Sequence, residues 1–245
     1  MKKLLALILS LVLLVGSMAL VIGEESILVV TNPEYPPFEF IDSDGSIVGY
    51  DIDVMNEIAE LAGLTVEYEA IAFDAVIPAV ITNPTTIGLS GISITEERKL
   101  NVNFSEGYID AGLALIVKTD STIKSEADLV GKVIGVQLGT TSDFKAEEIT
   151  GKDNVATYKS FIEAVKDLQG SKIDAVIVDK PVGLAILSEL NDPKLQISDM
   201  ELAADWYGIA VNKANLDLLD KINAALATMK ENGFFDELNT KYFGN

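Results

Sequence analysis

The sequence contains no cysteine and no histidine among its 245 residues. Without cysteine the protein can form no disulfide, no thiol nucleophile, no cysteine-ligated zinc site and no lipid-modified cysteine. Without histidine it can contain neither a Ser-His-Asp triad nor a metal site with imidazole ligands. These two absences exclude much of ordinary hydrolase chemistry, and we expect neither a metal nor a cofactor.

Positive charge is also scarce, because 18 lysine and arginine residues stand against 38 aspartates and glutamates, a formal net charge of −20. Without the first 23 residues, which include Lys2 and Lys3, 16 basic residues face 38 acids and the charge is −22. A field of that sign repels nucleic acid and anionic lipid surfaces. We therefore expect no nucleic-acid partner, and a small zwitterion or cation is the more favourable ligand.

Residues 1–23 are typical of a signal peptide. A basic start is followed by residues 4–15, which are apolar except for Ser10, and then by small residues suited to cleavage. The apolar run is short for a membrane-spanning helix, which needs about 20 residues. The alternative is an uncleaved anchor, because apolar residues continue to Ile22. In both cases the folded part should begin near Glu24, in the periplasm, with no lipobox cysteine.

Strands and helices are predicted to alternate through the rest of the chain, which is typical of an α/β protein. Its length allows one large domain or two lobes of about 100 residues each. Two similar apolar segments, 108–118 and 206–213, each contain a glycine and are predicted to be long strands. If the chain crosses between lobes there, lobe 1 comprises 24–112 and 206–245, and lobe 2 comprises 113–205. The glycines would let both crossings act as hinges.

Arg98 is the only arginine in the chain, and it follows a stretch of small and hydroxyl-bearing residues. A guanidinium matches a carboxylate with two parallel hydrogen bonds, which an ammonium cannot do. Thr95, followed by Glu96 and Glu97, predicts the cap and first turn of a short helix. The pattern favours Ser93 and Arg98 converging on a small anion. The alternative is an arginine that pairs with a glutamate on a solvated helix face.

Other candidate site residues lie where strands are predicted to end, which is where ligands bind in open α/β sheets. Residues 139–142 (GTTS) offer N–H groups, hydroxyls and a helix N-terminus to a carboxylate, although an ordinary helix cap has the same composition. Asp179 suits an ammonium group, or alternatively a structural hydrogen bond. The rings of Tyr35 and Phe73 each follow a strand. With Arg98, these groups suit an amino-acid zwitterion.

Several segments occur in the order found in one known family. They are 35–40 (YPPFEF), 48–53 (VGYDID), Phe73 with 77–79 (IPA), 91–98 (GISITEER), 136–141 (VQLGTT), 174–176 (DAV) and 207–211 (YGIAV). Through them the whole mature chain resembles the polar amino-acid class of periplasmic solute-binding proteins, family 3, the receptors of ABC importers. The resemblance implies the type II fold, in which two lobes, each a mostly parallel sheet flanked by helices, close over a ligand.

The resemblance also implies roles for individual residues. Arg98 would bind the ligand carboxylate with Ser93, Thr141 and Thr140 of the predicted helix start. Asp179 would bind the ammonium group together with the carbonyl of Gly91. The ligand side chain would contact two rings and two amides: Tyr35, Phe73, Asn32 and Gln137.

Relatives that bind basic amino acids often have an acid at the position of Asn32, and the neutral amide here favours a polar ligand such as glutamine. Glu34 could still supply a charge if its loop folds inward. The protein would act as a monomer that delivers the amino acid to the permease of an ABC importer.

A different class is an enzyme on the same scaffold, for example a periplasmic cyclohexadienyl dehydratase acting on arogenate or prephenate. It would need a general acid with a raised pKa aimed into the cleft. Only Glu34 or Asp179 are placed for that role, and Asp179 beside an ammonium would stay ionised. We therefore expect no enzyme. A sensor's ligand-binding module is a third class, which would need a signalling domain that this sequence does not contain.

Overall fold

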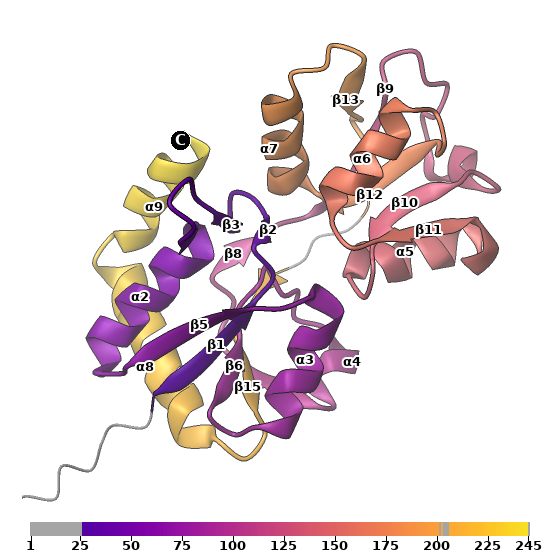
Figure 1. Ribbon diagram of the computed structural model, residues 1–245. Coiled ribbons are helices and arrows are strands. Elements are labelled where there is room, and N and C mark those ends of the chain that lie inside the picture. Colours follow the sequence, from indigo (N-terminus) through magenta and orange to yellow (C-terminus); the bar gives the residue numbers. More distant parts are fainter. Residues whose placement is uncertain (1–25, 201, 203–205, 245) are drawn as a thin grey trace, which may run out of the picture.

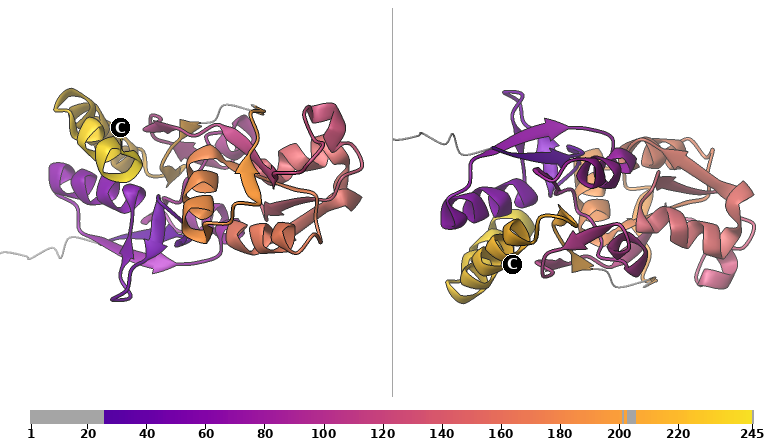
Figure 2. Two further views of the ribbon diagram at one scale, coloured as in Figure 1. Left: turned by 90° about the horizontal axis from the view of Figure 1, so that it is seen from above. Right: turned by 90° about the horizontal axis from the view of Figure 1, so that it is seen from below.

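The computed structural model describes residues 26–200, 202 and 206–244 of the chain. The predicted signal peptide, 1–23, lies outside this part, as do residues 203–205 at the predicted end of lobe 2. The described residues form two lobes, each built on a five-stranded sheet, which lie side by side in Figures 1 and 2. No helix in the described part combines the length and apolar character that a membrane span requires.

The first sheet has the strand order β5-β1-β6-β15-β7. Its strands are β5 (Val66–Ala70), β1 (Ile27–Thr31), β6 (Thr86–Gly88), β15 (Ala210–Asn212) and β7 (Val102–Phe104). β1 pairs in parallel with β5 and β6, and β15 is antiparallel to both of its neighbours. Val29 and Val30 of β1 belong to different buried clusters, because successive side chains of a strand point to opposite faces. Both faces of this sheet are therefore covered.

Four long helices cover the first sheet (Figure 1). They are α2 (Tyr50–Ala62), α3 (Phe73–Thr82), α8 (Leu216–Glu231) and α9 (Phe234–Phe243). Ile58 of α2 and Ile222 of α8 pack on the side of Val29, whereas Val80 of α3 packs on the side of Val30. A Cβ at Gly49, which precedes α2, would lie 2.1 Å from the carbonyl oxygen of Phe38, so only glycine fits there.

The second sheet has the order β11-β10-β12-β9-β13. Its strands are β11 (Val155–Tyr158), β10 (Ile134–Gln137), β12 (Ala175–Asp179), β9 (Leu113–Lys118) and β13 (Leu195–Ile197). β10 is parallel to β11 and β12, and β9 is antiparallel to β12 and β13. Helix α5 (Thr141–Thr150) covers one face, while α6 (Phe161–Gln169) and α7 (Lys180–Leu190) cover the other. Each lobe thus has one antiparallel strand in an otherwise parallel sheet, as predicted.

The two crossings between the lobes differ from the long strands that were predicted. Residues 108–118 form β8 (Ile109–Asp110) and then β9, and residues 206–213 form β14 (Trp206–Tyr207) and then β15. β8 and β14 belong to neither five-stranded sheet, so each predicted long strand is divided into a crossing strand and a strand of one lobe. β8 and β14 pair with each other between the lobes (Figure 1). The crossings therefore lie together, and their bending as a hinge stays a prediction.

A small three-stranded sheet lies beside the first lobe and contains part of the predicted site. Its strands are β2 (Glu34–Tyr35), β3 (Glu39–Ile41) and β4 (Ile47–Val48). β3 and β4 form a hairpin, and β2 pairs with β3. This pairing places Tyr35 and Glu39 directly opposite each other.

Candidate functional site

Strand ends from both lobes meet at the boundary between them, and predicted site residues follow these ends. Asn32 follows β1 in the first lobe, while Gln137 ends β10 and Asp179 ends β12 in the second. Four hydrogen bonds between side chains, or from a side chain to a carbonyl, join the lobes at this place. The sequence folds in this way because the carboxyl ends of parallel strands lie at one edge of a sheet.

Tyr35 joins the two lobes through its hydroxyl group. The hydroxyl donates a hydrogen bond to Oδ2 of Asp179 and lies 2.9 Å from the hydroxyl of Tyr207. All three side chains are buried. Burial, and then the charge of Asp179, raise the pKa values of Tyr35 and Tyr207 well above 10, so both phenols stay neutral and can donate hydrogen bonds.

Gly91 brings the backbone of the first lobe against these two tyrosine rings. Its φ is +52°, and a Cβ at this position would lie 2.6 Å from Cε1 of Tyr35 and 3.2 Å from Cε2 of Tyr207. No larger residue fits there without displacing the rings. The Gly91 backbone therefore lies close to the contact between Tyr35 and Asp179, where the predicted ammonium site would be.

Two neutral amides meet across the boundary. Nε2 of Gln137 donates to Oδ1 of Asn32 at 2.9 Å and to the carbonyl of Lys159 at 2.8 Å. Nδ2 of Asn32 donates to the carbonyl of Ile71 at 3.0 Å. Both amide side chains are buried, whereas the carboxylate of Glu34 is exposed in β2. The acid that could have supplied a charge thus does not fold inward.

Arg98 lies between the lobes at the other end of the site. It belongs to the short helix α4 (Glu96–Lys99), which begins at Thr95, whose Oγ1 accepts the N–H of Arg98 at 3.1 Å. Nη1 donates to the carbonyl of Ser93 at 2.7 Å, and Nη2 donates to the carbonyl of Gly139 in the second lobe at 3.1 Å. The guanidinium lies 5.7 Å from the centre of the Phe73 ring, within cation–π range.

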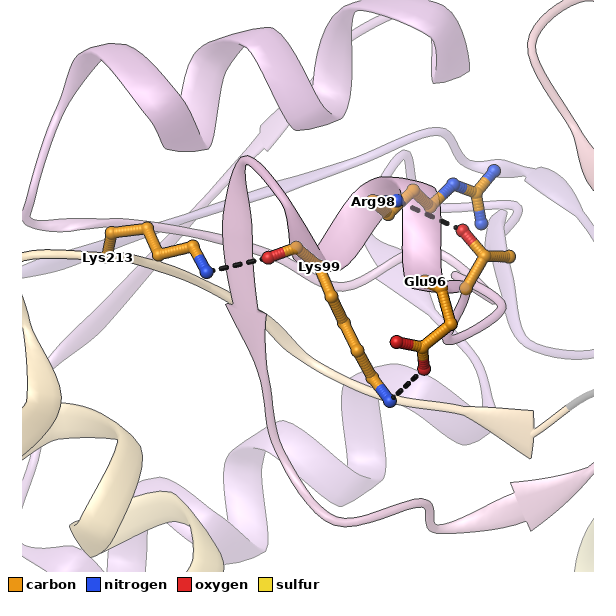
Figure 3. Close-up of polar contacts among 5 residues, drawn as sticks. Glu96, Arg98, Lys99 and Lys213 are labelled. Carbon is orange, nitrogen blue, oxygen red and sulfur yellow. Dashed lines mark hydrogen bonds and ion pairs between the residues drawn. The ribbon is translucent and has the colours of Figure 1, made fainter.

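The sequence left open an Arg98 that pairs with Glu96 or Glu97 on a solvated helix face, but both terminal nitrogens of Arg98 donate to carbonyls, one of them in the second lobe. Glu96 instead forms an ion pair with Lys99 at 2.8 Å. Figure 3 shows the side chains of Arg98 and Glu96 pointing in different directions from α4. The Arg98 side chain points towards the second lobe, where Nη2 reaches the carbonyl of Gly139.

Hydroxyl groups from both lobes lie beside Arg98. Oγ of Ser93 is 3.3 Å from Oγ1 of Thr141, at the first turn of α5. Thr140 serves as the N-cap of α5: its Oγ1 accepts the N–H of Asp143 at 3.2 Å and donates to the carbonyl of Gln137 at 2.7 Å. The positive end of the α5 dipole therefore faces the same region as the guanidinium. The Thr140 hydroxyl stabilises this helix start, while the Thr141 hydroxyl faces the first lobe.

The structure adds two residues that the sequence did not single out. Tyr207 shares the hydroxyl contact with Tyr35 although 172 positions separate them. Oγ of Ser90 accepts the backbone N–H of Asn32 at 2.9 Å. Tyr207 belongs to the segment 207–211, one of those that resemble the family, and this was the only hint in the sequence of a position in the site. Nothing in the sequence places it beside Tyr35.

The arrangement suits a small dipolar ligand. Donors surround Arg98 at one end, the Asp179 carboxylate lies at the other, and the rings of Tyr35 and Phe73 lie between the lobes with two buried amides. Among the described residues, no group of three or more acidic side chains is placed to hold a metal ion. The chemistry that these groups offer is recognition through hydrogen bonds and charge.

Comparisons with known proteins agree over almost the whole chain. The model of the bacterial extracellular solute-binding proteins, family 3, matches residues 27–245. An arginine-binding periplasmic protein of Mannheimia haemolytica is 34% identical over 226 residues, which are 89% of this chain and 91% of that protein. An ancestral arginine-binding protein bound to glutamine has a TM-score of 0.84 and 39% identity, covering 90% of this chain and 98% of that one. The arginine-, lysine-, histidine-binding protein ArtJ of Geobacillus stearothermophilus has a TM-score of 0.85 and 32% identity, covering 90% and 96%.

The hydroxyl of Tyr35 should contribute measurably to stability. We expect Tyr35→Phe to lower the free energy of unfolding by about 1–3 kcal/mol, because the buried Asp179 carboxylate loses a donor. Urea denaturation followed by circular dichroism measures this change. Tyr158→Phe is the matched control, because Tyr158 donates to the half-buried Asp167 at 3.0 Å, which also binds Lys172, and its loss should cost about 0.5 kcal/mol or less. Equal losses in the two variants would contradict the role of Tyr35.

Proposed function

Because the chain belongs to family 3 of the bacterial extracellular solute-binding proteins, we propose that it captures an L-α-amino acid between its two lobes. It is a binding protein and not an enzyme, and its folded part works outside the cytoplasm as the receptor of an ABC importer. The observation that carries the proposal is the position of Arg98. Its guanidinium is held between the lobes beside hydroxyls of both and beside the start of α5.

The ligand carboxylate would bind at Arg98, Ser93 and Thr141. These groups come from both lobes, so a carboxylate held by them would link the lobes directly. Arginine can bind a carboxylate with two hydrogen bonds, and such charge-assisted bonds are roughly twice as strong as neutral ones. Binding and closure would therefore depend on the same contacts.

The ligand ammonium group would bind at Asp179, with the carbonyl of Gly91 as a second acceptor. The support is that Asp179 is buried, ends a strand of the second lobe, and is in contact with Tyr35 beside the Gly91 backbone. The rings of Tyr35 and Phe73 would then enclose the rest of the ligand. Asp179 and Arg98 belong to different lobes, so a zwitterion would be held from both sides.

We assign the ligand side chain to the polar uncharged class, with glutamine as the first candidate. Asn32 and Gln137 are buried neutral amides, and amides pair well with another amide. One similar structure holds glutamine, although that protein and others among the relatives are named for arginine. The side chain would exchange hydrogen bonds with the two amides in place of their bond to each other.

A screen of the twenty amino acids by thermal shift, followed by isothermal titration, tests this function. We expect L-glutamine to raise the melting temperature most, because binding to the folded state alone stabilises it. A shift produced by arginine, lysine or histidine and not by glutamine would overturn the ligand assignment. No shift with any amino acid would overturn the proposed function itself.

Replacement of Arg98 tests the carboxylate site. We expect Arg98→Ala to weaken amino-acid binding by about 2–5 kcal/mol, because the ligand carboxylate is left without its charged partner. Lys99→Ala is the matched control: it removes a neighbouring cation that pairs with Glu96 on the exposed side of α4 (Figure 3). Titration calorimetry should show unchanged affinity in the control, and unchanged affinity in Arg98→Ala would exclude this role.

Asn32→Asp tests the side-chain site. A carboxylate at this position would favour a cationic ligand, so we expect the ratio of arginine affinity to glutamine affinity to rise about tenfold, or about 1.4 kcal/mol. Glu34→Gln is the control, because the exposed Glu34 carboxylate should not affect the ratio. Competition titrations with the two amino acids measure the ratio. An unchanged ratio in Asn32→Asp would show that this position does not contact the ligand side chain.

A further inference from the structure

Two fully buried acids, Glu39 of β3 and Asp51 of α2, lie beneath the candidate site. Both side chains are 0% exposed. None of the ion pairs among the described residues includes either of them. A buried carboxylate without a cation is costly unless hydrogen bonds or a proton compensate for its charge. This pair therefore needs an explanation in terms of its contacts.

Asp51 joins the site to the crossing between the lobes. Its Oδ2 accepts the backbone N–H of Gly91 at 2.9 Å, and its Oδ1 accepts the hydroxyl of Tyr108 at 2.8 Å. Gly91 is the residue whose backbone packs on Tyr35, and Tyr108 directly precedes β8. One carboxylate thus holds both the binding segment and the start of a crossing strand.

Glu39 supports the neighbouring part of the same segment. Its Oε1 accepts the hydroxyl of Ser90 at 2.8 Å, and Ser90 in turn accepts the backbone N–H of Asn32. Its Oε2 is buried and receives no hydrogen bond from the described residues. Burial and then the charge of Asp51 raise the pKa of Glu39 well above its usual value, which favours a proton on Glu39. Oε2 of Glu39 is the atom that can carry this proton, because its Oε1 already accepts from Ser90.

We propose that Glu39 and Asp51 are positioning residues that hold the Ser90–Gly91 segment in its ligand-binding arrangement and connect it to Tyr108. The proposal rests on the proposed function, because it assigns Gly91 and Asn32 to the ligand site. Neither acid contacts the ligand itself. They act through the backbone groups and the hydroxyl that they hold.

The pair makes this positioning sensitive to pH. Burial raises the pKa of Asp51 to about 6, and burial followed by the charge of Asp51 raises the pKa of Glu39 well above its usual value. The titratable side chains that face the pair are tyrosines, whose pKa values are all raised and which stay neutral: Tyr35, Tyr50, Tyr68 and Tyr108. Acids with raised pKa values stabilise the fold at low pH, and this contribution is lost as pH rises through the folded-state values. Loss of the proton from Glu39 leaves two negative charges, those of Glu39 and Asp51, together in a buried site.

The pH profile of binding in Glu39→Gln tests the proposal. The amide can accept from Ser90 and is uncharged like the protonated acid, so it replaces the protonated acid without titrating. We expect wild-type affinity for L-glutamine, or for L-arginine measured in parallel, to fall as pH rises above about 6, the pKa of Asp51, and the fall to be smaller in the variant. Titration of the ligand amino group affects both proteins equally. Parallel profiles in the two proteins would overturn the proposal.

Asp51→Asn tests the two accepted hydrogen bonds. An amide offers one oxygen to two donors, so we expect affinity to fall about tenfold or more while the far-ultraviolet spectrum stays native. Asp53→Asn is the matched control on the same helix, because Asp53 binds the exposed Lys241 at 2.6 Å and faces away from the site. Wild-type affinity in a folded Asp51→Asn variant would overturn the proposal. If this variant does not fold, the Glu39→Gln profiles decide.

A measurement without ligand separates this proposal from the proposed function. The amide resonance of Gly91 should shift with pH in the wild-type protein as the pair loses its protons, and should shift less in Glu39→Gln, where only Asp51 titrates. A Gly91 resonance that titrates identically in both proteins overturns the proposal. A protein that binds no amino acid but shows the expected difference at Gly91 overturns the proposed function and leaves the acid pair supported.

Discussion

The contact between the two lobes at the candidate site depends on the guanidinium of Arg98. A guanidinium in this position needs hydrogen-bond acceptors from both lobes. Arg98 donates to the carbonyls of Ser93 and Gly139, which belong to different lobes. Its backbone is fixed by the Thr95 cap, and its side chain lies over the Phe73 ring. These contacts orient the one arginine of the chain towards the second lobe. If Arg98 binds the ligand carboxylate as proposed, recognition of the ligand and contact between the lobes occur at the same atoms.

The remaining contacts across the boundary follow the same principle. Tyr35 with Asp179, Asn32 with Gln137, and Ser93 with Thr141 each pair polar groups from different lobes. A hydrogen bond of this kind contributes only about 0.5–1.5 kcal/mol net, although leaving a buried partner unpaired costs more. Such contacts can be exchanged for contacts with a ligand at small cost. That property suits a receptor whose lobes must bind and release.

Glu39 and Asp51 differ from these pairs because they lie within the first lobe and beneath its surface. They hold Ser90 and Gly91 without reaching the second lobe. If contacts across the boundary are exchanged for contacts with a ligand, the binding segment of the first lobe must itself stay in place. The hydrogen bonds of the two buried acids hold that segment. Through Tyr108, Asp51 is also connected to the strands that join the lobes.

The sequence by itself determined the features that local patterns encode. The alternation of strands and helices and the capped start of α4 depend on residues a few positions apart, and the absence of cysteine and histidine follows from composition alone. Candidates such as Arg98, Ser93 and Asp179 also came from local patterns, and the resemblance to a family added the type II fold and the candidates Gly91, Asn32 and Gln137. Edge strands β11 and β13 and the helix α9 were not predicted, since short, half-exposed elements have weak patterns. Only the tertiary structure decided the breaks in the crossing strands and the partners of Tyr35, Asn32 and Glu39. The distant partners are Ser90 for Glu39, Gln137 for Asn32, and Asp179 and Tyr207 for Tyr35. They lie 51 to 172 positions away in the chain, and they meet because two sheets and a hairpin pack together, which no local pattern records.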